Sequence, residues 1–249
     1  MLLEAASHRR PHHAAKNVTP EITLSSVFSD RPTESFGAGA GLVWEGDPAT
    51  HVFEVVEGVL RIFRIIGDGR RAITGFLYPG DILGVSMRDR YLYSAEAVNA
   101  VRVRRFSAAS FQQAINLSPE LRPQFFAKLC DEMAGAQEQM VMLSRKNAEE
   151  RICTFLLRLA ERKAGDRADN QDVDVPMTRL DMADYLGLTI ETVSRTITSL
   201  IGRGVISQRG RHDMRINKYS MLARLAGDGD CMGANGSGEP YARQAVWPA

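Results

Sequence analysis

Four polar side chains share one face of a predicted helix in the last third of the chain: Glu191, Ser194, Arg195 and Thr198. Their offsets of three, four and seven residues bring them together on a helix of 3.6 residues per turn. Arginine suits guanine, and glutamate can accept a hydrogen bond from cytosine. The face therefore predicts hydrogen bonding to base edges. It also fits an amphipathic helix whose polar side merely meets solvent.

The elements that position this face lie between Thr178 and Ile206. Thr178 and Asp181 have capping-box spacing, which predicts the start of a first helix. Gly187 permits a sharp turn, and Thr189 can cap a second helix. Apolar residues at helical intervals are expected to face inward, and these are Leu180, Ala183 and Leu186, then Val193, Ile197, Leu200 and Ile201. This is the layout of a helix-turn-helix whose second helix enters the major groove of DNA.

A predicted β-hairpin wing follows the two helices. Two short alternating runs flank the basic turn at Arg209 and Arg211. From Gly187 to Arg224, seven Lys and Arg stand against two acidic residues, a net charge of +5, although the whole chain carries only +1. Basic charge concentrated in this way favours DNA phosphates. Phosphate contacts are expected from Thr178, Thr189, Thr192, Arg209, Arg211 and His212.

Two motifs resemble the CRP/FNR family of bacterial transcription regulators, and most closely its FixK branch. They are Glu191-x-x-Ser194-Arg195 and LSRKNAEER at residues 143 to 151, and the likeness covers about residues 40 to 226. The resemblance implies that Glu191, Ser194 and Arg195 contact the half-sites of a TTGAT-N4-ATCAA-like palindrome. It further implies a homodimer that activates transcription by recruiting RNA polymerase, at genes of microaerobic respiration and nitrogen fixation.

A heptad pattern runs through Leu121 to Ser144. Apolar or small residues follow each other at steps of three and four, and they are Phe126, Leu129, Met133, Ala136, Met140 and Leu143. Two copies of such a helix can pair as a parallel coiled coil, which would set two recognition helices about one turn of DNA apart. The alternative is one long helix that packs its stripe on its own sheet domain.

Residues 41 to 106 contain short β-branched and aromatic runs separated by turns, which predicts an antiparallel roll. The family's cyclic-nucleotide-binding members carry a Glu for the ribose and an Arg for the phosphate in this region. Here Asp81 replaces the Glu, and Tyr93-Ser94 stands where the Arg would be, so cyclic-nucleotide binding is not expected. Three other arginines remain as substitutes but are more simply explained as surface or strand residues: Arg88, Arg90 and Arg102.

The cysteines are too few for the iron–sulfur cluster that the resemblance implies for FNR proteins. None occurs in the first 129 residues, and the three present, which cannot supply four thiolates, are Cys130, Cys153 and Cys231. The N-terminal histidines are expected to be solvated rather than haem ligands, and they are His8, His12 and His13. We therefore expect no cofactor. The alternative is a regulator of the same family that is gated by haem or another small ligand in the roll.

The composition and motifs exclude several other classes of protein. No apolar run approaches a membrane span, and the N-terminus lacks the apolar core of a secretory signal, so a cytoplasmic protein is expected. No GxxxxGK[ST], HExxH or nucleophile elbow occurs, which predicts that the chain is not an enzyme. A more distant alternative is a regulatory module that acts through protein contacts alone, and the basic wing argues against it.

At 249 residues and 44% hydrophobic content the chain can supply two small cores. The fold class predicted is α+β, with an N-terminal antiparallel β-roll of the jelly-roll type seen in cyclic-nucleotide-binding domains, a long dimerisation helix and a C-terminal winged helix-turn-helix. The expected segments are a flexible N-terminus (1–24), the roll (25–118), the dimerisation helix (119–147), the winged helix-turn-helix (148–226) and a disordered tail (227–249). Within the winged helix-turn-helix segment, residues 164 to 174 are expected to form a loop.

Overall fold

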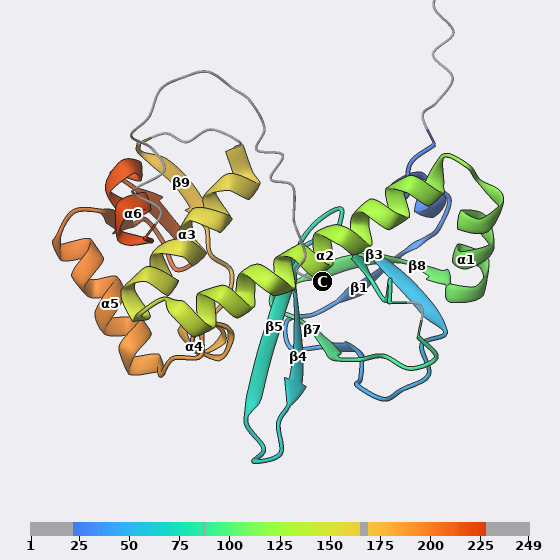
Figure 1. Cartoon of the computed structure of the whole chain (residues 1–249), viewed down its shortest axis with the longest axis horizontal. Helices are drawn as coiled ribbons and strands as arrows, with labels where there is room; N and C mark the ends of the chain where they lie inside the picture. The colour runs from blue at the N-terminus through green and yellow to red at the C-terminus, as the bar shows by residue number, and fades with distance from the viewer. Residues whose placement is uncertain (1–21, 87, 165–168, 228–249) are drawn as a thin grey trace, which may run out of the picture.

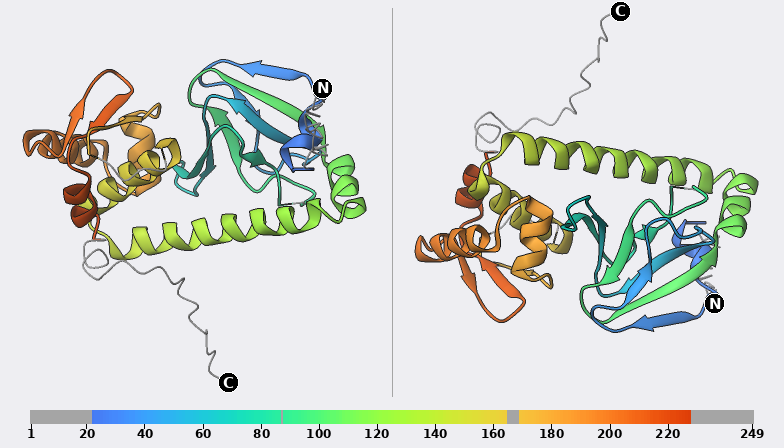
Figure 2. Two further views of the ribbon diagram at one scale, coloured as in Figure 1. Left: turned by 90° about the horizontal axis from the view of Figure 1, so that it is seen from above. Right: turned by 90° about the horizontal axis from the view of Figure 1, so that it is seen from below.

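The computed structural model describes residues 22–86, 88–164 and 169–227. A sheet domain and a predominantly helical domain lie side by side, and one long helix runs along both (Figure 1, Figure 2). The predicted flexible N-terminus (all but its last three residues) and the predicted C-terminal tail (all but its first residue) lie outside the described residues.

The first domain is an antiparallel roll of two four-stranded sheets, as predicted. One sheet has the order β1-β8-β3-β6 and the other β2-β7-β4-β5. The strands are β1 Thr33–Phe36, β2 Gly41–Val43, β3 His51–Glu57, β4 Leu60–Ile65, β5 Arg71–Leu77, β6 Ile82–Leu83, β7 Ser94–Ala97 and β8 Val101–Ser107. Between β3 and β4 the chain turns at Gly58, whose φ of +82° and closeness to the Ala100 carbonyl leave no room for a side chain. The apolar residues of both sheets face each other and form the core.

A short helical layer closes one end of the roll. It consists of the 3-10 helix η1 (Ser25–Phe28), α1 (Ala108–Leu117) and the start of α2 (Leu121–Arg145). Phe28, Phe106 and Phe111 form its aromatic centre, with ring centroids 5.6 to 6.4 Å apart. Leu129 of α2 packs against this layer, so the predicted heptad stripe is in part an intramolecular one.

The C-terminal domain contains the predicted winged helix-turn-helix. Its elements are α3 Ala148–Ala164, β9 Gln171–Asp174, α4 Arg179–Leu186, α5 Ile190–Gly202, β10 Ile206–Gln208, β11 Asp213–Ile216 and α6 Tyr219–Leu225. The loop prediction for residues 164 to 174 is wrong in its last part, because residues 171 to 174 form β9 and pair with β11. The wing is therefore a three-stranded sheet in the order β10-β11-β9. None of the described helices is both long and apolar enough to cross a membrane.

Candidate DNA-binding site

The first helix of the pair, α4, begins with the predicted capping box. The Thr178 hydroxyl accepts from the Asp181 amide at 3.1 Å, and the Asp181 carboxylate accepts from the Thr178 amide at 3.0 Å. Both interactions satisfy amides that have no partner within the helix. At the other end Gly187 is left-handed, with φ +63°, and its amide closes the last turn on the Ala183 carbonyl. The sharp turn to the second helix is thus built as the sequence predicts.

The second helix, α5, presents the predicted polar face to solvent. Val193, Ile197 and Leu200 are buried, whereas the side chains on the opposite side are exposed, and these are Glu191, Ser194, Arg195 and Thr198. Two residues expected in the inward stripes are not buried: Leu180 is 50% and Ile201 36% exposed. Both lie at the margin of an apolar face.

The N-terminus of α5 holds a polar pair next to the exposed face. The Thr189 side chain accepts from the Thr192 amide at 3.2 Å, and the two hydroxyl oxygens lie 3.0 Å apart. Hydrogen bonds from its own backbone amide and from the Thr189 hydroxyl, with nearby Arg195, hold the pKa of the Glu191 carboxyl below its usual range. Glu191 is therefore ionised at neutral pH, in the form that only accepts hydrogen bonds.

The wing places Arg209, Arg211 and His212 in exposed positions at its tip. Elsewhere in the domain part of the basic charge is neutralised within the chain. Arg215 of β11 makes two hydrogen bonds to Asp172 of β9, at 2.6 and 2.8 Å, and Arg203 pairs with Glu149 of α3. The sequence sum of +5 therefore overstates the charge available for a polyanion, since Asp172 and Glu149 lie outside the range counted.

One basic residue that the sequence analysis missed lies beside the predicted phosphate contacts. Arg179 is half-buried, its one hydrogen bond among the described residues is to the Met182 sulfur at 3.5 Å, and burial lowers its pKa. It borders a cavity of about 240 Å³ between α4 and the wing, lined among others by Thr178, Arg179, Gln208, Gly210, Arg211 and His212. The Thr178 hydroxyl itself donates to Asp181 at 2.8 Å, so Arg179 is the stronger donor at this position.

Contacts with the roll also hold α4 in place. Asp181, 1% exposed, accepts from Arg61 at 3.2 Å and from Arg71 at 2.8 Å, and Arg71 also donates to Asp184 at 2.9 Å. Next to these ion pairs the Phe76 ring lies 5.3 Å from Tyr185 and 6.3 Å from Phe155, between centroids. The helix-turn-helix is thus fixed to strands β4 and β5 by charge and by aromatic packing.

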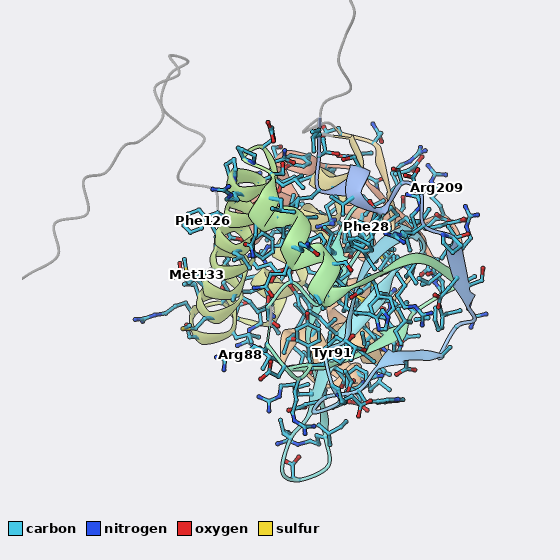
Figure 3. The ribbon with its side chains drawn as sticks, turned by 90° about the vertical axis from the view of Figure 1, so that its right-hand side faces the viewer. Phe28, Arg88, Tyr91, Phe126, Met133 and Arg209 are labelled. Carbon is cyan, nitrogen blue, oxygen red and sulfur yellow. The ribbon has the colours of Figure 1, made fainter. Side chains whose placement is uncertain are left out.

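The predicted pairing face of α2 is exposed. Phe126, Met133 and Met140, at seven-residue intervals, are 68%, 60% and 66% exposed, and Figure 3 shows the first two on the outer edge of the helix. Ala136 is exposed as well. Leu143 is less so, and its side chain lies against the turn at Gly187. Contact between two copies through this face stays a prediction.

Asp81, which stands where the family resemblance would place the ribose-binding Glu, is held by two ion pairs. Asp81 accepts from Lys128 of α2 at 3.0 Å and from Arg162 of α3 at 2.7 Å. Burial raises the pKa of Tyr93 to about 12, so this residue is a neutral phenol. Of the substitute arginines, Arg90 donates to the Gly46 carbonyl and Arg102 pairs with Glu57, while Arg88 is exposed.

Metal and redox ligands are sparse in the described parts of the chain. Among these residues no group of three or more His, Cys, Asp or Glu side chains is placed to hold a metal ion. Cys130 is half-buried on α2, and Cys153 is buried in α3, where desolvation raises its pKa to about 12. Cys231 and the N-terminal histidines, which are His8, His12 and His13, lie outside the described residues.

Comparison with known proteins agrees with this architecture. Residues 33–118 match the cyclic nucleotide-binding domain, and residues 150–225 match the Crp-like helix-turn-helix domain. The chain is 41% identical over 172 residues to the nitrogen fixation regulation protein FixK of Bradyrhizobium diazoefficiens, a match covering 69% of this chain and 73% of that one. The FixK of Azorhizobium caulinodans is 40% identical over 209 residues, covering 84% and 81%.

A solved structure has the same fold. The structure of FixK2 from Bradyrhizobium japonicum superimposes with a TM-score of 0.73 at 32% identity, over 78% of this chain and 96% of that one. These similarities extend over both domains, and the proteins concerned are regulators rather than enzymes. The chain therefore belongs to the CRP/FNR family of DNA-binding transcription regulators, in its FixK-like branch.

Proposed function

We propose that the chain binds as a homodimer to a TTGAT-N4-ATCAA-like palindrome and activates transcription by recruiting RNA polymerase. The observation that carries the proposal is the exposed face of α5, where Glu191, Ser194 and Arg195 lie together in front of a buried stripe. Arg195 then donates to guanine, the ionised Glu191 accepts from a cytosine amino group, and Ser194 supplies a short hydroxyl contact.

Phosphate contacts surround this face in the proposed complex. Thr189 and Thr192 place two hydroxyl oxygens 3.0 Å apart at the N-terminus of α5, and these hydroxyls can rotate to donate to phosphate. At the other edge the wing supplies Arg209, Arg211 and His212. Thr178 marks the start of α4, and its neighbour Arg179 is the donor we add there. Such contacts set register and affinity without reading sequence.

The dimer proposal rests on the exposed apolar side of α2. Phe126, Met133 and Met140 would otherwise expose large side chains to water at regular intervals over about four turns of helix. Two copies in parallel bury these residues against each other, and the two-fold symmetry then matches that of a palindrome. Leu129 and Leu143 belong to the margins of this interface, because each also packs within its own chain.

For the genes controlled we propose microaerobic respiration and nitrogen fixation. The support is the printed name of the FixK relatives, nitrogen fixation regulation protein, at 40% and 41% identity. Activity without a cyclic nucleotide is supported by the absence of the expected Glu and Arg, and by the ion pairs with Lys128 and Arg162 that already engage the carboxylate of Asp81, the residue in place of that Glu.

The test is DNA binding by the full chain, purified in air without added effector, at one near-physiological salt concentration. Fluorescence anisotropy is compared for a TTGAT-N4-ATCAA duplex and for the same duplex with both half-sites scrambled. We expect at least about a thousandfold preference, the lower range for specific recognition. Equal binding of both duplexes contradicts the proposed box. Restoration of the preference by haem or another small molecule, with a matching absorption band, would establish the effector-gated alternative.

A further inference from the structure

We propose that Arg151 is a positioning residue: it fixes α2 to the helix-turn-helix and thereby sets the spacing of the half-sites that the dimer accepts. The proposal rests on the dimeric, palindrome-binding function proposed above. It concerns the segment from Leu143 to Arg151, called the junction below, which carries one of the two sequence motifs and contains none of the three proposed base-contacting residues.

Arg151 bonds three backbone carbonyls that belong to different parts of the chain. Its Nε donates to the Lys146 carbonyl at 2.9 Å, one terminal nitrogen to Leu143 at 2.8 Å, and the other to Leu186 at 2.8 Å. Leu143 lies in the last turn of α2, Lys146 is its C-cap, and Leu186 is the last residue of α4. A single guanidinium therefore links the ends of two helices.

Charge explains why an arginine suits this position. The last carbonyls of a helix lack intrahelical donors and carry the negative end of the helix dipole. The ends of α2 and α4 both turn such carbonyls toward the cation of Arg151. The planar fork of arginine donates in three directions at once, which the single ammonium of lysine cannot reproduce in the same geometry.

The remaining motif residues tie the junction to the rest of the DNA-binding domain. Asn147 and Glu150 form a reciprocal capping box at the start of α3, at 3.1 and 2.8 Å. Lys146 donates to the carbonyl of Ala226, the C-cap of α6, at 2.7 Å. Glu149 pairs with Arg203, the C-cap of the recognition helix α5. The junction thus contacts α4, α5 and α6. Through these contacts the orientation of α2 determines the orientation of the DNA-reading face of α5.

The turn of the helix-turn-helix is part of the same contact. A side chain on Gly187 would come within 3.5 Å of both the Arg151 guanidinium and the Leu143 side chain. The junction is therefore a rigid connection, called the splint, between α2 and the helix-turn-helix. In a dimer, the angle that it sets between α2 and the helix-turn-helix of each copy fixes the separation and relative rotation of the two α5 helices.

The consequence for DNA concerns the spacer and not the bases. Each base pair added to the spacer rotates one half-site relative to the other by roughly 34° about the DNA axis and moves it about 3.4 Å further along that axis. A rigid junction cannot follow such a change, whereas a loosened one can. Loss of the Arg151 bonds should therefore relax spacer selectivity while base discrimination inside each half-site is kept.

The experiment compares the full-length wild type with Arg151→Lys on duplexes whose spacers are one base pair shorter than, equal to or longer than N4. Arg158→Lys is the matched control, because Arg158 lies on the same helix but contacts the side chains of Glu138 and Tyr185, whereas Arg151 donates to main-chain carbonyls at two helix ends. We expect Arg151→Lys to lower the affinity ratio between the best and the shifted spacers by about tenfold. Discrimination against a mutated half-site base should stay within about twofold in both variants.

A second measurement needs neither DNA nor the dimer. Trypsin can cut after Arg145 and Lys146, inside the junction, and a rigid segment is protected from cutting. Arg151→Lys keeps the number of trypsin sites, and we expect cutting at Lys146 to become about tenfold faster than in wild type or Arg158→Lys. Glu149→Gln, with Glu138→Gln as its control, gives a second route with smaller shifts in the same direction and carries the test if Arg151→Lys does not fold.

Unchanged spacer profiles in Arg151→Lys and Glu149→Gln, or unchanged cutting at Lys146, would overturn the positioning role. A wild type that ignores the box in every spacer instead contradicts the proposed palindrome, and the spacing claim falls with it. Faster cutting in that case still supports the splint. The two failures are therefore separable.

Discussion

Substitution of Asp181 by alanine tests how far the docking of α4 on the roll stabilises the DNA-binding domain. Asp181 is 1% exposed, closes the capping box with Thr178, and accepts hydrogen bonds from Arg61 and Arg71. Loss of a helix cap costs about 1 kcal/mol. Each lost charge-assisted bond adds about 1 kcal/mol here, less than the usual range of about 1.5 to 3 kcal/mol, because both arginines keep another carboxylate. The expected loss of unfolding free energy is about 3 kcal/mol.

The assay is urea unfolding followed by far-ultraviolet circular dichroism, at fixed protein concentration so that association does not vary. With a slope of roughly 3 kcal/mol per molar urea for unfolding of the whole chain, the midpoint should fall by about 1 M. Asp184→Ala is the matched control, since Asp184 is about one-fifth exposed and contacts only Arg71 among the described residues. The unfolding free energy of that variant should fall by less than about 1 kcal/mol. Equal shifts for the two variants would refute the assignment of buried, shared charge to Asp181.

Other expected outcomes concern DNA contacts, pairing and thiol reactivity. Arg195→Ala should reduce the binding free energy by about 1 to 3 kcal/mol and relax discrimination at one base pair. Arg211→Ala should instead weaken binding to all duplexes alike, and the slope of log affinity against log salt concentration should become less steep by about 1. Affinities are measured by anisotropy titration. These roles would be contradicted if both variants lost affinity equally on specific and on random DNA. Met133→Glu should convert the dimer to monomer in sedimentation velocity, because it places two carboxylates opposite each other in an apolar seam, and an unchanged dimer would argue for another interface. Burial raises the pKa of Cys153 to about 12, so its thiol stays protonated at pH 8 and should resist iodoacetamide, while half-buried Cys130 is alkylated; mass spectrometry showing the reverse order would contradict this.

The helix-turn-helix could be predicted from sequence because its determinants are local. Thr178 and Asp181 are three residues apart, and the geometry of one helical turn brings them together whatever surrounds them. Gly187 adopts a left-handed conformation that few other residues tolerate. The alternation around Arg209 likewise predicts the wing hairpin. The roles of individual residues toward bases and phosphates remain predictions, since they depend on a partner molecule.

What the sequence did not reveal depends on partners distant in the chain. Strand β9 is polar and short, and it forms because β11 offers it a free edge about forty residues later. The neutralisation of Arg203 and Arg215 comes from Glu149 and Asp172, which a charge sum over one segment does not include. The contacts of Arg151 could not be predicted from sequence either, because its acceptors are main-chain carbonyls, which no side-chain pattern indicates.

The Asp81 carboxylate connects three parts of the molecule, since it lies in the roll and bonds Lys128 of α2 and Arg162 of α3. All three groups of this connection belong to the same chain. Their local concentration is fixed and cannot be lowered by dilution. The three parts are therefore joined in every folded copy of the chain, whatever small molecules surround it.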